Sequence, residues 1–137
     1  MVSRAQYQAV YRQVQVGTSG REKLIILLYN GAIVALQQAR ELVRVRDYVG
    51  KGKVIFKAQD IVLELSLCLN DDYGTFATNL RRLYAYIYRR LSEANTGADP
   101  LPIEEALHLL TKLRDAWALA TTGVATQEHR EQAGTVA

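Results

Sequence analysis

The sequence has few of the residues that form disulfides, bind metals or interrupt helices. Its 137 residues include one cysteine, two prolines and two histidines. The single cysteine, Cys68, excludes an intramolecular disulfide and any metal site with several cysteine ligands. Because Cys68 falls on an apolar helical stripe, we interpret it as a small core residue. The prolines are Pro100 and Pro102, so long helices can run uninterrupted through the rest of the chain.

Long hydrophobic runs and a strong charge excess are also missing. No apolar run approaches the roughly 20 residues that a membrane-spanning helix needs, and the first ten residues hold no signal-peptide hydrophobic region. The net charge of +3 is well below the clustered excess of a dedicated nucleic-acid binder. We therefore expect a reduced, cytoplasmic protein with no membrane span and no nucleic-acid partner. Its length suits one domain with a real core.

The stretch that the rest of the chain is organised around is the apolar segment from Lys57 to Leu69. At about 100° of turn per residue, one helical stripe carries five residues that would pack a bundle helix: Val54, Ala58, Ile61, Leu65 and Cys68. The roughly opposite side is apolar as well, with Phe56, Leu63 and Leu67. A helix that is apolar on most of its surface is usually buried. A chain this small has little protein to cover it, so the second apolar side indicates a partner.

Helical periodicity, caps and turn clusters predict four helices. They are expected at residues 19–46, 47–69, 75–95 and 102–123, with Ser19 and Asp47 at N-termini and Gly123 as the last C-terminal cap. Short turns between helices of this length predict an all-α fold, an antiparallel up-down four-helix bundle. The third stripe is expected to hold Phe76, Leu80, Leu83, Ile87 and Leu91, and the fourth includes Leu110, Leu113 and Trp117.

The two ends of the chain are expected to lie outside the bundle. Residues 1–18 are interpreted as a mobile N-terminal arm, either frayed or docked reversibly on an apolar surface. A docking arm would use the helical face shared by Tyr7, Val10, Tyr11 and Val14. Residues 124–137 are polar and mixed, which predicts a disordered C-terminal tail. The three segments are therefore an arm at 1–18, a bundle at 19–123 and a tail at 124–137.

Catalytic and metal-binding constellations are not found in the sequence. Glu105 and His108 have the Glu-x-x-His spacing of carboxylate-bridged di-metal bundles, but that site needs the motif twice and two further glutamates. The second histidine, His129, lies in the predicted tail. There is no glycine-rich phosphate loop and no nucleophile with an obvious base. We expect no enzymatic activity, no metal and no cofactor.

The third predicted helix interleaves arginines with aromatics between Leu80 and Leu91. Nucleic-acid-binding proteins use such mixtures for phosphate contact and base stacking, but here the arginines scatter around the helix, which favours solvated arginines beside a core stripe. The chain has eight tyrosines and two phenylalanines, and tyrosine is enriched at protein interfaces. The pattern predicts a non-enzymatic bundle whose apolar groove takes up an amphipathic helix from a partner.

Several motifs in order and spacing resemble one family. They are Arg21-Glu-Lys-Leu-Ile, Leu28-Tyr-Asn-Gly-Ala32, Lys57-Ala-Gln-Asp-Ile-Val62, Asn79-Leu, Leu83-Tyr-Ala-Tyr-Ile87, Arg89-Arg-Leu-x-Glu-Ala-Asn95 and Leu113-Arg-Asp-Ala-Trp117. Together they resemble the flagellar export chaperone family FliS, over about residues 7–117. Asn30 departs from the aspartate usual in that family, and Gly50 and Gly52 replace better helix formers.

The resemblance implies a cytoplasmic bacterial chaperone for newly made flagellin that works without ATP. In that family the disordered C-terminal segment of flagellin wraps around the bundle and becomes partly helical, which blocks premature polymerisation before type III export. The family's N-terminal arm is thought to cover part of the groove when flagellin is absent, and Tyr7, Tyr11 and Val14 match that arm. The export apparatus or a co-chaperone is a possible further partner, and a homodimer remains open.

The predicted groove is lined by residues outside the core stripes. In addition to Tyr7 and Tyr11 in the arm, these are Ile55, Phe56, Gln59, Leu63 and Leu67 on the second helix, Ala77, Tyr84 and Tyr88 on the third, and Leu109 and Ala116 on the fourth. The alternative for each is packing inside the bundle or in a homodimer. For the whole protein, the alternatives are a nucleic-acid-binding bundle and a purely structural homodimer.

Overall fold

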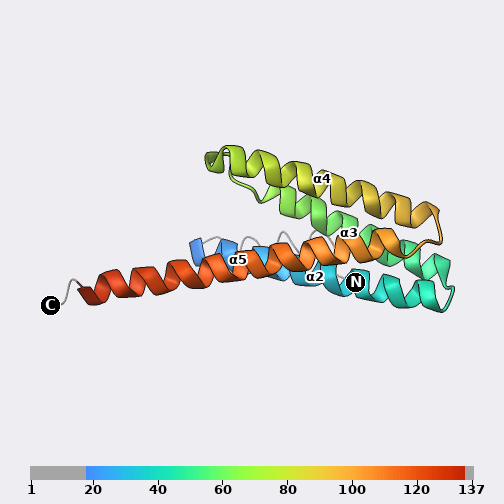
Figure 1. The fold of residues 1–137 in the computed structure, drawn as a ribbon, viewed down its shortest axis with the longest axis horizontal. Helices are drawn as coiled ribbons and strands as arrows, with labels where there is room; N and C mark the ends of the chain where they lie inside the picture. The colour runs from blue at the N-terminus through green and yellow to red at the C-terminus, as the bar shows by residue number, and fades with distance from the viewer. Residues whose placement is uncertain (1–17, 135–137) are drawn as a thin grey trace.

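The computed structural model describes residues 18–134, and this part of the chain is almost entirely helical. Its four α-helices lie roughly along one axis (Figure 1). In chain order the elements are α2 (Thr18–Arg44), α3 (Tyr48–Leu67), the short 3-10 turn η1 (Asp71–Tyr73), α4 (Thr75–Thr96) and α5 (Leu101–Gly134). The described residues contain no strand.

Each long helix packs against two others, so the four form a ring around one core. α2 and α4 each contact both α3 and α5, whereas the diagonal pairs do not approach each other closely in the described chain. The α2–α3 and α4–α5 turns lie at the same end of the molecule, as consecutive antiparallel helices require (Figure 1). The predicted antiparallel four-helix bundle is confirmed.

The predicted stripes form most of the core. On α3, Ala58, Ile61 and Leu65 are buried, and Val54 and Cys68 pack against the core from its edge. The stripe of α4 is only partly inside, because Leu80, Ile87 and Leu91 are buried but Phe76 is 55% exposed. Phe76 lies at the start of α4, so the prediction that it is a core residue is wrong.

The start of α3 explains why a glycine follows its cap so closely. Asp47 is the N-cap, as predicted, and its side chain accepts a hydrogen bond of 2.9 Å from the backbone N–H of Gly50. A Cβ on Gly50 would lie 2.6 Å from the Asp47 carboxylate. Gly50 therefore allows the capping carboxylate to sit against the helix, and α3 begins directly after Asp47 despite the glycine's weak helix propensity.

A buried lysine connects the start of α3 to the end of α4. Lys51 is only 3% exposed, and its ammonium donates to the backbone carbonyls of Ala94 at 2.9 Å and Gly97 at 2.7 Å. Ala94 lies in the last turn of α4 and Gly97 is its C-cap residue, and the carbonyls at a helix C-terminus lack partners within the helix. Lys51 thus satisfies both its own buried charge and the end of a neighbouring helix.

The helix ends differ from the prediction at two places. α2 as described already includes Thr18, so Ser19 lies inside its first turn rather than at the cap. α5 does not end at Gly123 but continues as helical backbone to Gly134, because one glycine in a helix interior costs only about 1 kcal/mol. Beyond the bundle this part of α5 projects past the other three helices (Figure 1). An isolated helical segment of that length is marginal in water, so the disorder expected for residues 124–137 stays a prediction.

A hydrogen-bonded pair of tyrosines lies in the core. The hydroxyls of Tyr29 on α2 and Tyr84 on α4 bond to each other, and the two residues are 0% and 2% exposed. Because α2 and α4 are diagonal in the ring, this polar contact crosses the centre of the bundle.

Removing one hydroxyl of the pair should leave the other without its partner, so the effects of the two substitutions should not add. In Tyr29→Phe or Tyr84→Phe, the hydroxyl of the other tyrosine stays buried without its hydrogen-bond partner. Each substitution should therefore lower the free energy of unfolding by about 1–3 kcal/mol. The double variant should be clearly less destabilised than the sum of the two. Urea unfolding followed by circular dichroism measures all four proteins. Additive losses would show that the two hydroxyls do not depend on each other.

The same pair predicts a loss of stability at alkaline pH. Burial raises the pKa of Tyr29 to about 12 and also raises the pKa of Tyr84, from an ordinary value of 10.0 in both cases. Unfolded tyrosines therefore release their protons first, so this contribution is complete below about pH 10 and is lost as the pH rises through the folded values. Urea unfolding across that range should show a smaller fall for the double phenylalanine variant than for the wild type. Equal falls in the two proteins would contradict the role of the pair.

Candidate partner-binding surfaces

The outward side of α3 carries a row of exposed apolar side chains. Phe56 is 62% exposed, Leu63 47% and Leu67 68%, and their spacing places them on one side of the helix. Three large apolar residues in one row are more than the single exposed residues that most surfaces carry. The exposure that the sequence predicted for these three residues is confirmed, whereas partner binding by them stays a prediction.

The row lies beside the seam between α3 and α4. Gln59, at the edge of this seam, donates from its side-chain nitrogen to the carbonyl of Tyr88 at 3.1 Å and to the hydroxyl of Ser92 at 2.9 Å. Tyr88 on α4 is itself 36% exposed. We call Phe56, Leu63, Leu67 and Tyr88 the α3–α4 face. Phe56, Leu63 and Leu67 form its α3 side and Tyr88 forms its α4 side, and the buried amide of Gln59 lies between the two sides.

Four residues predicted to line the groove lie inside the bundle instead. Ile55 and Ala77 are 0% and 1% exposed, and Gln59 and Tyr84 are 3% and 2% exposed. The prediction that they lie off the core is wrong because α3 and α4 each pack on two neighbours, so a wide arc of each helix is covered. Gln59 and Tyr84 are tolerated there because both are hydrogen-bonded. Tyr7 and Tyr11 lie outside the described residues.

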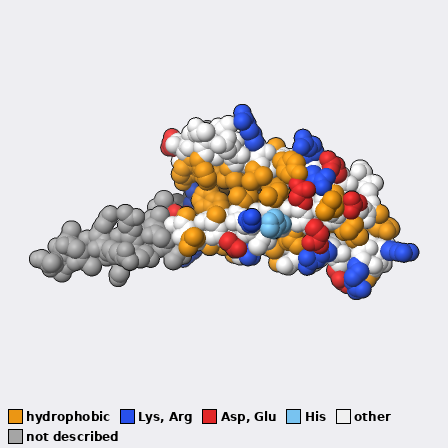
Figure 2. All heavy atoms as spheres, in the orientation of Figure 1, with side chains coloured by type: hydrophobic (Ala, Val, Ile, Leu, Met, Phe, Trp, Pro, Cys, Tyr) orange, Lys and Arg blue, Asp and Glu red, His pale blue; other side chains and the backbone are white. Residues whose placement is uncertain are grey.

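The remaining two predicted residues belong to a different surface. Leu109 is partly buried and Ala116 is exposed, and both lie on the side of α5 that faces α4. Around them are apolar residues that the sequence assigned to core stripes. We call the set the α4–α5 face: Phe76, Leu83, Leu109, Leu113, Ala116 and Trp117. Figure 2 shows a broad hydrophobic patch where α4 and α5 diverge.

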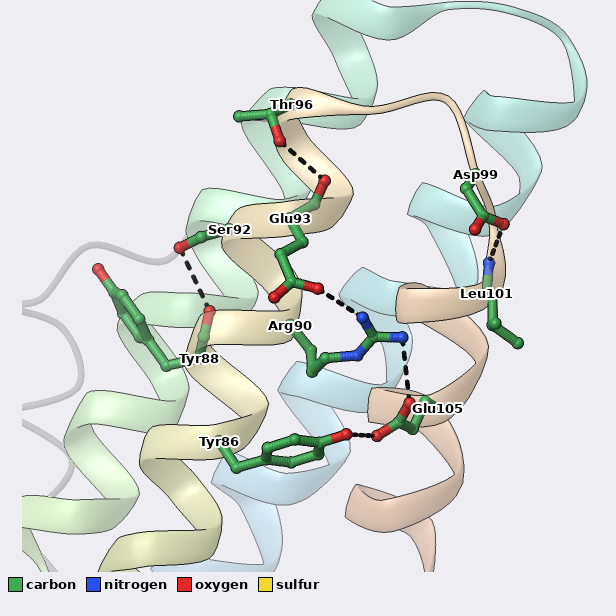
Figure 3. Close-up of polar contacts among 9 residues, drawn as sticks. All are labelled: Tyr86, Tyr88, Arg90, Ser92, Glu93, Thr96, Asp99, Leu101 and Glu105. Atoms are coloured by element: carbon green, nitrogen blue, oxygen red, sulfur yellow. Dashed lines mark hydrogen bonds and ion pairs between the residues drawn. The ribbon is translucent and has the colours of Figure 1, made fainter.

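A polar cluster closes one end of this second surface. The Tyr86 hydroxyl donates to the Glu105 carboxylate, and Arg90 lies 3.1 Å from Glu105 and 2.5 Å from Glu93 (Figure 3). The hydrogen bond from Tyr86 and the charge of Arg90 lower the pKa of Glu105. We call Tyr86, Arg90, Glu93 and Glu105 the α4–α5 clasp, because it joins the two helices through side chains.

The arginines of α4 do not form a nucleic-acid-binding stripe. Arg81 donates to the carbonyl of Leu69 at 3.2 Å, Arg90 is held in the clasp, and Arg89 lies 5.4 Å from the centre of the Tyr86 ring. Three of the four arginines are thus engaged with different parts of the fold. The expected solvated arginines are found at Arg82 and Arg89, which are exposed, whereas Arg81 and Arg90 are only partly exposed and contact other parts of the fold.

The chemistry of catalysis or metal binding is not assembled in the part of the chain that the structure describes. Among the residues whose side chains the structure describes, no group of three His, Cys, Asp or Glu side chains could hold a metal ion. Burial, with a smaller effect of Glu64, raises the pKa of the Cys68 thiol, which suits a packing residue. None of the described helices is long and apolar enough to cross a membrane.

Known proteins with related sequences point to one family. The model of the family "Flagellar protein FliS" matches residues 3–123. The chain is similar to the flagellar secretion chaperone FliS of Salmonella typhimurium, with 36% identity over 126 residues that cover 90% of this chain and 93% of the relative. It is 32% identical to FliS of Bacillus subtilis over 87% of this chain and 89% of that relative. The flagellar secretion chaperone FliSB of Pseudomonas aeruginosa is 36% identical, over 85% of this chain and 94% of the relative.

The same substitution at two neighbouring leucines of α3 tests the exposed row. Leu65 is 2% exposed and Leu67 is 68% exposed. Leu65→Ala should lower the free energy of unfolding by about 3 kcal/mol because it opens a cavity, whereas Leu67→Ala should change it by about 0.5 kcal/mol or less. Chemical denaturation of both variants measures the difference. A large loss for Leu67→Ala would mean that this side chain is covered in solution.

Proposed function

Because this chain belongs to the FliS family of flagellar secretion chaperones, we propose that it binds the disordered C-terminal segment of newly made flagellin. A chaperone role in flagellar export, without enzymatic activity, follows from the family itself. The identity of the client and the surface that holds it are the proposal. The observation that supports it most directly is the α3–α4 face, with three large side chains between 47% and 68% exposed in one row.

The α3–α4 face suits an amphipathic segment that folds as it binds. Phe56, Leu63 and Leu67 span about three turns of helix, which is the length over which a partner helix would present its own apolar side. Covering this row removes apolar surface from water at about 25 cal/mol per Å². Ordering a disordered segment opposes that gain by several kcal/mol, so the complex is stable without being irreversible.

This balance matches the task of an export chaperone. A segment that is apolar on one side for packing into a filament would drive assembly if it stayed exposed in the cytoplasm. Covering that side delays polymerisation and keeps the chain unfolded for type III export. No nucleotide is required, because binding and release follow from the same reversible contact. A cytoplasmic location is part of the proposal, since newly synthesised flagellin is found there.

The other partners and the arm are secondary parts of the proposal. The arm at residues 1–18, with Tyr7 and Tyr11, would cover part of the apolar surface until the client arrives. The export apparatus or a co-chaperone would meet the loaded complex. A homodimer that uses the α3–α4 face would compete with the client, because both would bury the same side chains.

Placing a charge in the exposed row should abolish client binding without unfolding the bundle. Wild-type protein and flagellin should elute as a one-to-one complex in size-exclusion chromatography, and flagellin without its C-terminal segment should not bind. Leu63→Glu should weaken binding by at least about tenfold, since a carboxylate would be buried against apolar surface. Isothermal titration calorimetry measures the loss.

The matched control is Val34→Glu on α2. Val34 is 51% exposed, close to the 47% of Leu63, but lies on another helix. It should leave the affinity for flagellin unchanged. Equal binding of truncated flagellin, or unchanged binding by Leu63→Glu, would rule out the α3–α4 face as the client site. An affinity that falls steeply with salt would instead favour a charge-driven contact.

A further inference from the structure

One charged residue interrupts the exposed apolar row of α3. Asp60 is exposed and lies one turn after Phe56 and one turn before Leu63. At 100° of turn per residue, Asp60 is about 40° around the helix from Phe56, about 60° from Leu63 and about 20° from Leu67. Its carboxylate therefore stands within the apolar row, on the side of α3 that the proposed client covers.

The row has the spacing of a coiled-coil contact. Phe56, Asp60, Leu63 and Leu67 are separated by four, three and four residues, which is the alternation of a and d positions in a heptad repeat. Lys53, also exposed, precedes Phe56 by three residues and continues the alternation. We call these five residues the heptad row. It runs for about 21 Å along α3 at 1.5 Å per residue, which a partner helix of about two heptads would match.

The Asp60 carboxylate has no partner of opposite charge in the part of the chain that the structure describes. None of the ion pairs or hydrogen bonds of the described side chains involves it. Lys57, one turn earlier, is half-buried and forms no ion pair with it, and Glu64, one turn later, has the same sign. On α4, Arg81 donates to the carbonyl of Leu69. In the free bundle Asp60 is therefore solvated by water.

A helix that covers the row would remove that water. Asp60 would then be buried beside Phe56 and Leu63, and a carboxylate that is buried without a partner is strongly unfavourable. An aspartate side chain is too short to reach past a docked helix. Lys53 is long enough to bend aside and keep its ammonium in water. Asp60 is therefore the residue of the heptad row that a client has to match.

We propose that Asp60 selects the client: the client helix carries one lysine or arginine within its apolar stripe, and this residue pairs with Asp60. Apolar residues one turn away on both sides of that cation cover Phe56 and Leu63. The inference rests on the proposed function and names what the flagellin segment presents to the α3–α4 face. A polar residue at one a position fixes the register of two helices, so the pair also fixes where along α3 the client lies.

Three synthetic peptides of about 21 residues test the selection by charge. Each repeats leucine at its a and d positions. The lysine peptide has lysine at the central a position, the glutamate peptide has glutamate there, and the shuffled peptide exchanges that lysine with an alanine from the outer side. Isothermal titration calorimetry should show that the lysine peptide binds at least about tenfold more tightly than the glutamate peptide and about fivefold more tightly than the shuffled one.

The expected order is opposite to that of a non-specific attraction. The net charge of the chain is +3, so attraction between net charges would favour the glutamate peptide. Preference for the lysine peptide therefore reports a local pairing. The shuffled peptide has the same composition and net charge as the lysine peptide, so a difference between these two depends on the position of the lysine within the stripe.

Asp60→Lys should reverse the preference, so that the glutamate peptide binds more tightly than the lysine peptide. The matched control is Glu41→Lys on α2, which changes the net charge by the same amount at an exposed acidic residue whose ion-pair partner, Arg44, is also exposed. This control should keep the order of the three peptides. Asp60 and Glu41 are both exposed, so both variants are expected to fold, which circular dichroism checks. Equal affinity of wild-type protein for the lysine and glutamate peptides would refute the selection.

Flagellin separates a failure of this inference from a failure of the proposed function. Asp60→Lys should weaken flagellin binding by at least about tenfold, because two cations would then meet. If Leu63→Glu weakens flagellin binding but Asp60→Lys leaves it unchanged, the client site stands and the selection by Asp60 is wrong. If neither variant changes the affinity, the proposed function fails and this inference fails with it.

A second copy of the chain is the competing occupant of the heptad row. Its Lys53 can meet Asp60 in an antiparallel pair of α3 helices, because the two charges are one heptad apart on the same row. Sedimentation velocity of the free protein should show a monomer. A dimer that Asp60→Lys dissociates would assign the row to a second copy and overturn the proposal.

Discussion

A ring of four helices has one interior, and α3 carries more apolar surface than that interior can hold. Its inner side packs Ala58, Ile61 and Leu65 against the neighbouring helices. Phe56, Leu63 and Leu67 lie on the far side, beyond the arcs that α2 and α4 cover. The free-energy cost of exposing apolar surface to water grows with its area. The exposed apolar row of α3 therefore favours binding of an amphipathic partner that covers it. The family's role as a secretion chaperone fits this physical constraint.

Buried and half-buried polar contacts determine where α4 sits, and α4 separates the two surfaces. Lys51 holds the C-terminal end of α4 to α3, Gln59 holds its middle through the carbonyl of Tyr88, and Tyr84 reaches across the core to Tyr29. On the other flank, the clasp at Arg90 and Glu105 is the polar junction with α5. Each of these groups has a specific partner whose loss would be costly. α4 is therefore held along α3 by the contacts of Lys51 and Gln59, and it is joined to α5 by the clasp.

The sequence was most informative where a single helix determines the answer. Asp47 as an N-cap, the stripe of α3, and the exposure of Phe56, Leu63 and Leu67 depend on local geometry and on one periodicity. Predictions that required two helices were weaker. Ile55, Ala77 and Tyr84 were placed in a groove but are buried, and Leu109 and Ala116 belong to another surface, because helical angles do not reveal which neighbour covers which arc. The burial of Gln59 could not be predicted from the pattern of α3 alone. Its hydrogen-bond partners, Tyr88 and Ser92, lie on α4, about thirty residues further along the chain.

By itself, the sequence determined the helices, their order, the all-α bundle and the family, because periodicity, caps and motifs are properties of neighbouring residues. It also determined that α3 has a second apolar side in addition to the one that packs in the core. Only the tertiary structure decided which apolar residues remain outside and that they divide into two faces. The reason is that exposure depends on how far one helix lies from the next, and that distance is set by packing and by contacts such as those of Lys51 and Arg90 between residues far apart in the chain.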